Sequence, residues 1–334
     1  MLPTVHCRDG QRPPECSNRH RGMTLIELTV AMAIGLFLIG GALYVYSQSK
    51  NSYRASDSLA RLQESARFAM DTLEPDIRLA RFWGLNSEPA LVTNPAGLEA
   101  TCDGAAAPWA LDDLSAAVAA QDDAFDLGCP TFNDNPRDGS DVLILRHAEP
   151  WQANVEPLAD NGRLQVQTTL AQGRLFNDGI EPLGADASTH NVTINAYYVS
   201  NESSFDPALP SLRRLTLGPD GEFDDQEVIP GVENLQVQLG MDTDRDGDVD
   251  RYVDGDHPLV TFGAAGFDPD AQVIAVRIWM LVATPADDPA WVDERQYPTP
   301  DADLGDLVGG SDGYPSTFRR LQIAKTIFLN NEGA

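Results

Sequence analysis

Apolar residues form one long, nearly uninterrupted segment close to the beginning of the chain. From Met23 to Tyr46 every side chain is apolar, small or hydroxylic except that of Glu27. A helix rises about 1.5 Å per residue, so this segment reaches across the roughly 30 Å hydrocarbon layer of a bilayer. We therefore predict a membrane-spanning helix over residues 23–46. An ionised carboxylate in that layer costs about 3 kcal/mol, which indicates that Glu27 has a functional partner.

The chain becomes polar after Tyr46, but apolar residues still recur mostly at three-to-four spacing, as on one face of a helix. They are Leu59, Leu62, Ala66, Phe68, Ala69, Met70, Leu73 and Ile77. We predict that the membrane helix continues without a break as an amphipathic helix over residues 47–84, with this face against a globular domain. Pro75 predicts a kink or the approaching end of the helix, and Gly84 predicts its stop.

Residues 85–334 are predicted to form a β-rich globular domain. Strand patterns occur at 141–147, 164–170, 192–199, 212–217, 235–239, 273–283 and 321–329. Turn residues separate these runs and no long helical pattern alternates with them, which favours an antiparallel sheet and an α+β fold class. The alternation in 235–239 predicts a strand with one solvated face. Residues 85–140 are predicted to be mostly irregular, with a short helix over 111–120.

The charge balance of the chain is strongly acidic. Its 334 residues carry 23 basic and 51 acidic side chains, a formal net charge of -28. Such a surface repels nucleic acid and suits cations or a basic partner, so no nucleic-acid partner is expected. The alternative is that the acidity only keeps an exported domain soluble.

The residues that flank the apolar segment predict its orientation. Four arginines precede it: Arg8, Arg12, Arg19 and Arg21. The positive-inside rule then places the amino terminus in the cytoplasm and the β-rich domain outside. In an oxidising compartment the two cysteines that follow the apolar segment, Cys102 and Cys129, are expected to form a disulfide, with two free thiols as the alternative.

The residues at the start of the apolar segment resemble a processing signal. Gly22 followed by Met23-Thr24-Leu25-Ile26-Glu27 is similar to the prepilin signal of type IV pilins and pseudopilins. The resemblance implies that prepilin peptidase removes the leader, residues 1–22, and that the new amino terminus at Met23 is methylated. It also implies that Glu27 is an assembly contact for the amine of a neighbouring subunit. A plain membrane anchor with Glu27 near the interface is the alternative.

Further segments resemble the PilW family of minor pilins. Residues 65–84 are similar to the post-membrane helix of that family and 232–237 to the run before its aspartate loop, while 325–331 are more loosely similar to its closing strand. The resemblance implies a pilin-like fold, with the long helix packed on an antiparallel sheet. It also implies other minor and major pilins as partners, in the bacterial inner membrane and, after assembly, in the pilus. One departure is Leu85, where family members often carry a cysteine.

The second chemical signal is an acidic run at residues 242–250, called here the aspartate loop. Alternating carboxylates around Gly247 converge on one point, and calcium prefers such hard oxygen ligands. The predicted ligands are Asp242, Asp244, Asp246, Asp248, Asp250 and Asp254. Position twelve of an EF-type loop falls on Val253, so Asp254, Asp256 or no residue replaces the bidentate ligand. The alternative is an acidic, solvated hairpin, and residues 220–225 are predicted to be a turn only.

Enzyme motifs are missing from the sequence, which contains no GxSxG, no HExxH and no phosphate-binding glycine loop. We therefore expect a structural subunit rather than an enzyme: a minor pilin that primes or caps a type IV pilus. One alternative is a minor pseudopilin of a type II secretion system, similar to GspJ. The other is an anchored periplasmic enzyme or binding module.

Overall fold

The computed structural model describes residues 22–329, except 87, 113, 154, 185, 262–263, 269, 289–290, 302–304 and 312. The chain divides into two compact units, Met1–Ser56 and Asp57–Ala334. Apart from Gly22, the predicted leader lies outside the described residues, and so do the four arginines behind the predicted orientation.

One continuous helix, α1 (Leu25–Leu79), covers most of both predicted helical segments, but it begins two residues after Met23 and ends five residues before Gly84. Its amino-terminal part is long and apolar enough to span a membrane, and none of that part is buried. Pro75 lies inside the helix. The helix ends before Gly84, and Arg81 has a left-handed backbone with a φ of 73°.

The carboxyl-terminal part of α1 buries one stripe of small and apolar side chains. The buried residues are Leu62, Ala66, Ala69, Met70, Leu73 and Ile77. Phe68 and Leu59 were wrongly predicted to belong to this stripe, because they are 52% and 46% exposed. At 100° per residue Phe68 faces away from the stripe, whereas Leu59 lies almost one turn before its first buried member.

In the described part of the chain, the larger sheet contains eight strands in the order β1-β7-β6-β8-β5-β4, with β9 beside β8 and β10 beside β9. Neighbours run antiparallel except β1 and β7. The strands are Val92–Thr93 (β1), Val118–Gln121 (β4), Val142–Ala148 (β5), Asn161–Thr168 (β6), Gly173–Asp178 (β7), Ser188–Ser200 (β8), Ser211–Leu217 (β9) and Phe223–Pro230 (β10).

The second sheet is antiparallel and has the order β12-β11-β13-β16. Its strands are Val232–Asp242 (β11), Arg251–Val253 (β12), Gln272–Ala283 (β13) and Arg320–Phe328 (β16). Two short pairs complete the strands: Thr101–Cys102 (β2) with Ala105–Ala106 (β3), and Gln296–Tyr297 (β14) with Leu307–Val308 (β15). Short helices are Pro89–Leu91 (η1), Pro108–Leu111 (α2) and Phe132–Asp134 (η2).

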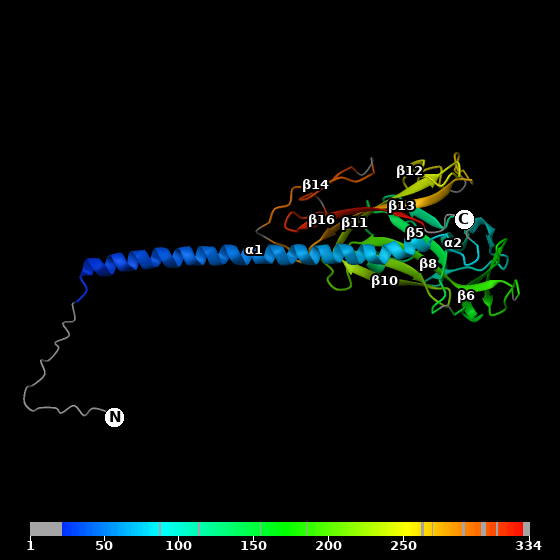
Figure 1. The fold of residues 1–334 in the computed structure, drawn as a ribbon, viewed down its shortest axis with the longest axis horizontal. Coiled ribbons are helices and arrows are strands. Elements are labelled where there is room, and N and C mark those ends of the chain that lie inside the picture. The colour runs from blue at the N-terminus through cyan, green and yellow to red at the C-terminus, as the bar shows by residue number, and fades with distance from the viewer. Residues whose placement is uncertain are drawn as a thin grey trace, which may run out of the picture. The chain divides into compact units, whose positions relative to one another are not determined.

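The core of the unit Asp57–Ala334 lies between the two sheets, around the last turns of α1 (Figure 1). Successive side chains of strand β5 point to opposite faces of the sheet and enter two different apolar clusters. Leu143 and Leu145 pack in the cluster that contains α1 and β11, whereas Val142 and Ile144 pack on the opposite face against residues of the 83–132 region. Both faces of the larger sheet are therefore covered.

The α+β fold and all seven predicted strands are confirmed, as β5, β6, β8, β9, β11, β13 and β16. The predicted helix over 111–120 is wrong: α2 ends at Leu111, and Val118–Gln121 instead pairs with β5. The solvated face predicted for 235–239 is also wrong at Gln236, which is 1% exposed and donates to Gly139 O. Sequence reasoning missed β7 and missed that β10 begins at Phe223, because tertiary pairing decides such short strands.

Candidate functional site

The amino-terminal end of α1 brings the predicted processing and assembly residues together. Gly22 and Met23 are exposed just before the helix. Thr24 N and Oγ1 both donate to Glu27 Oε2 at 2.9 Å, and Glu27 N donates to Thr24 Oγ1 at 3.3 Å. This reciprocal pair is a capping box, which the Thr-x-x-Glu spacing indicates. Glu27 therefore caps its own helix, a role that sequence reasoning missed.

The aspartate loop joins β11 to β12 and gathers three of the six predicted ligands. Carboxylate oxygens of Asp242, Asp244 and Asp250 all lie within 4.8 Å of one another. Asp242 is buried and accepts from Arg245 N at 2.6 Å and Gly247 N at 3.0 Å. These backbone donors fold the loop around the carboxylate of Asp242.

The outer positions of the loop are arranged differently. Asp246 Oδ1 accepts from Asp248 N at 2.9 Å, and Asp254 Oδ1 accepts from Gln238 Nε2 at 2.9 Å. The structure therefore does not place Asp246, Asp248 or Asp254 in the group of three. Hydrogen bonds from the side chain and backbone of Thr243 lower the pKa of Asp250. That carboxylate is accordingly ionised near neutral pH.

The predicted disulfide between Cys102 and Cys129 is confirmed, with Cα atoms 5.3 Å apart. Both cysteines are buried in the apolar cluster on the outer face of the larger sheet, together with Trp83. The bond joins β2 to the segment before η2. It therefore closes the loop region that covers this face of the sheet.

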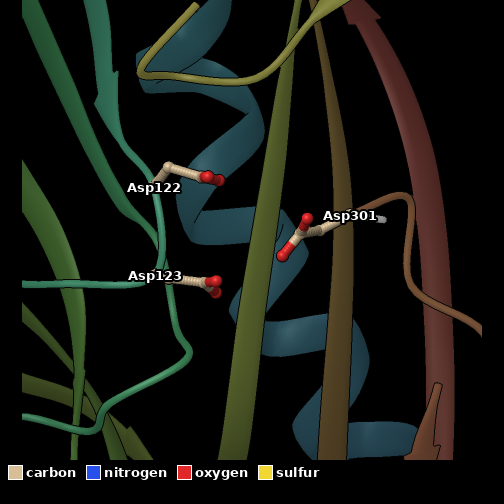
Figure 2. A group of neighbouring side chains, drawn as sticks. All are labelled: Asp122, Asp123 and Asp301. Atoms are coloured by element: carbon tan, nitrogen blue, oxygen red, sulfur yellow. The ribbon is translucent and has the colours of Figure 1, made fainter. Parts of the chain in front are cut away.

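A second acidic group appears only in the folded chain. Carboxylate oxygens of Asp122, Asp123 and Asp301 lie within 4.8 Å of one another. Figure 2 shows Asp122 and Asp123 on one segment, across from Asp301 on another. Burial, followed by repulsion from Asp123 and Asp301, raises the pKa of Asp122 to about 7. No sequence pattern could have found this group, because its members come from distant segments.

Asp141 adds a buried carboxylate to this group and connects the two sheets. Its Oδ1 accepts from Asp123 N at 3.0 Å and its Oδ2 from Val237 N at 2.7 Å, while Asp141 N donates to Leu235 O at 2.9 Å. Burial raises the pKa of Asp141 to about 8, although both backbone donors oppose the shift. We call Asp122, Asp123, Asp141 and Asp301 the buried carboxylate cluster.

Another buried polar group attaches α1 to the larger sheet. Asp76 accepts from His147 Nε2 at 2.7 Å, Asn195 Nδ2 at 2.8 Å and Tyr197 OH at 2.9 Å. Burial alone would raise the pKa of Asp76, but these three bonds hold it below its ordinary value. His147 Nδ1 contacts Ala148 O at 2.8 Å, so each ring nitrogen lies beside an oxygen. This arrangement is a buried polar network that joins α1 to β5 and β8.

Two models of known protein families match segments of this chain. A model described as type IV pilus-assembly protein W matches residues 196–331, from the second half of β8 through β16 and including the aspartate loop. A model of the prokaryotic N-terminal methylation motif matches residues 17–43, which include Gly22, Met23 and Glu27. No curated protein and no solved structure matches the chain.

Proposed function

Because the chain belongs to the PilW family of type IV pilus-assembly proteins, we propose that it is a minor pilin that primes or caps a type IV pilus. The observation that carries the proposal is the composition of α1. One helix bears an exposed apolar segment with the methylation motif at its start and a stripe buried in the β-rich unit at its end. Such a helix can hold a folded domain on a bundle of apolar helices.

Glu27 has a specific role in this proposal. Cleavage after Gly22 creates a positive amine at Met23, and an unpaired charge in an apolar helix bundle is unfavourable. A carboxylate from a neighbouring subunit offsets that cost. Both capping bonds from Thr24 end on Oε2 of Glu27, which leaves the other carboxylate oxygen, Oε1, for such a contact. Prepilin peptidase and other minor and major pilins are the proposed partners.

The proposed location follows from the same helix. The apolar segment of α1 anchors the chain in the inner membrane, and the unit with the two sheets lies in the periplasm until the subunit enters the pilus. The acidic composition of the chain is compatible with an exported domain. No catalytic role is proposed for any residue.

Processing is tested by intact-mass measurement of the chain isolated from cells with and without prepilin peptidase. We expect a protein that begins at methylated Met23 only when the peptidase is present. A chain that keeps residues 1–22 in the presence of the peptidase would contradict the proposal.

Assembly is tested by three variants of acidic residues on α1. Glu27→Ala and Glu27→Gln should insert into the membrane but fail to co-purify with other pilins, whereas Glu64→Ala, which changes an exposed carboxylate, should co-purify normally. Glu27→Gln keeps an oxygen acceptor for Thr24, so its failure would assign the requirement to charge rather than to capping. Normal assembly of Glu27→Gln would refute the counter-charge role. Co-purification with secretion pseudopilins instead of pilins would support the GspJ-like alternative.

We also propose that the aspartate loop binds calcium. Three carboxylates lie within 4.8 Å of one another: two flank Thr243 and the third directly precedes β12. Carboxylate oxygen is the ligand type that calcium prefers. Asp242, Asp244 and Asp250 would supply the first ligands. Asp246, Asp248 and Asp254 would complete the set only after the loop rearranges around the ion.

A further inference from the structure

A surface cavity of about 330 Å³ lies beside β6 and β8, outside both matched segments of the chain. Its lining includes Glu149, Trp151, Gln152, Arg163 and Asn191. Its volume is at the lower end of the range of about 300–1,000 Å³ for small-molecule sites. The cavity is therefore large enough for one small polar ligand.

Trp151 forms a fixed aromatic surface in this cavity. Its indole Nε1 donates to Thr189 O at 3.1 Å, and its ring stacks on His190 with centroids 5.4 Å apart and planes at 17°. The side chain is nevertheless 40% exposed. A ring that is already oriented loses little conformational entropy when a ligand covers it.

His190, the ring behind the indole, is itself held in place. Its Nδ1 contacts Glu149 O at 3.0 Å, its Nε2 contacts Ser188 Oγ at 3.2 Å, and Phe82 meets it edge-on with centroids 5.6 Å apart. Burial lowers the pKa of His190, so the ring is neutral at pH 7. The aromatic surface therefore has a rigid and uncharged support.

Polar side chains form the rest of the wall. The carboxylate of Glu149 accepts from Gln152 Nε2 at 2.9 Å and from Asn191 Nδ2 at 2.8 Å, and Arg163 Nη2 lies 3.8 Å from it. Each of these planar groups has more hydrogen-bonding capacity than these contacts use. Donors and acceptors are thus arranged in one network beside the exposed indole.

We propose that this cavity binds a neutral sugar residue. A pyranose ring presents a face of C–H groups that covers an aromatic ring, while its hydroxyl groups, each both donor and acceptor, point outward to carboxylate and amide groups. An aromatic cage for an ammonium ion fits less well. Trp151 is the one aromatic side chain among the described residues that line the cavity, whereas such a cage needs several. The lining also contains two carboxylates, Glu149 and Glu156, but Arg163 places a positive charge among them.

The test uses the full chain in a polyoxyethylene detergent, which has neither a sugar nor an ammonium headgroup. Saturation-transfer NMR with glucose, galactose, mannose and N-acetylglucosamine as separate probes should detect saturable binding of at least one sugar. Trp151→Ala should weaken that binding at least about tenfold, and Trp151→Phe should restore part of it. Trp291→Ala, which changes a tryptophan that packs on Arg319 in another loop, should bind like the wild type.

A second variant separates sugar binding from folding. Gln152→Ala removes an exposed side chain that donates to Glu149, so it should weaken sugar binding without affecting the melting temperature. Unchanged binding in both Trp151→Ala and Gln152→Ala would overturn the proposal. So would the absence of saturable binding for all four sugars, or binding of tetramethylammonium in their place.

Discussion

The aspartate loop and the buried carboxylate cluster are two acidic regions that are built in opposite ways. The loop is one contiguous hairpin segment, and its own backbone donors, such as Gly247 N, bind its carboxylates. The cluster draws carboxylates from segments far apart in the sequence, and Asp141 and Asp301 in it are only 2% and 6% exposed. One region follows from local sequence and the other from tertiary packing.

The difference shows two ways of accommodating like charges. In the loop, hydrogen bonds from Thr243 lower the pKa of Asp250, whereas burial and repulsion from neighbouring aspartates raise the pKa of Asp244. In the cluster, burial raises the pKa of Asp141 to about 8 and that of Asp122 to about 7, which favours proton uptake. A cation would relieve the repulsion in the loop, and protons relieve it in the cluster.

The first and largest effect is a pH dependence of stability that the cluster should show and the loop should not. Asp141 has an ordinary pKa near 4 in the unfolded chain and about 8 in the folded chain, so the folded state binds more protons between these values. Its stabilising contribution is present below about pH 4 and is lost as pH rises toward 8. Each pH unit in that range costs about 1.4 kcal/mol per group, so the loss should reach a few kcal/mol.

Urea unfolding at pH 5 and pH 8 measures this effect. The free energy of unfolding of the wild type should fall between the two values by more than that of Asp141→Asn, which cannot ionise. An equal fall in both proteins would show that Asp141 does not hold its proton in the folded state. Replacement of Asp250, whose pKa is lowered, should not reduce the fall.

The next effect is a calcium response that belongs to the loop alone. A ligand that binds only the folded state stabilises it by about 2.7 kcal/mol at a hundredfold excess over its dissociation constant. The melting temperature of the full chain should therefore rise with calcium, and Asp244→Ala should abolish the rise. Asp122→Ala is the matched control, because it removes a carboxylate of the cluster and should leave the response intact. A calcium response that depends on Asp122 rather than Asp244 would show that calcium binds the cluster and not the loop.

A glycine between the two regions provides a third test. Gly255 follows the loop and lies against β4, where an added Cβ would come within 2.6 Å of Ala120 C and 2.7 Å of Ala120 O. Because backbone atoms cannot move aside cheaply, Gly255→Ala should destabilise the fold by about 2 kcal/mol. Gly35→Ala, where an added Cβ meets no atom within 4 Å, should not destabilise it. Thermal unfolding of the two variants would detect the difference.

The smallest expected effect comes from a single charge of the cluster. Asp122→Asn removes repulsion with Asp123 and Asp301 and should stabilise the chain, by less than about 1 kcal/mol because Asp122 is partly exposed. The gain should be larger at pH 8 than at pH 5, since Asp122 ionises with a pKa of about 7. Melting temperatures at the two pH values measure it. A gain that is equal at both would point to packing instead of charge.

Local pattern accounts for much of what could be predicted from the sequence. The aspartate loop was predicted because its carboxylates alternate within a few residues. The seven apolar runs after residue 140 formed strands because each is short and is bounded by turn residues. The short strand β4 was predicted as helix because its alanines have a high helix propensity, which pairing with β5 overrides. Gln236 was predicted to be solvated, although the Gly139 region covers it.

Neighbouring residues alone encode the apolar helix, the methylation motif around Gly22 and the contiguous aspartate loop, because their spacing fixes a local geometry. Contacts between distant segments place the carboxyl-terminal part of α1 between two sheets, Asp122 near Asp301, and Trp151 on His190 beside a polar wall. Those contacts depend on which surfaces bury one another away from water. The local pattern of residues around each segment does not specify which distant segment it will contact.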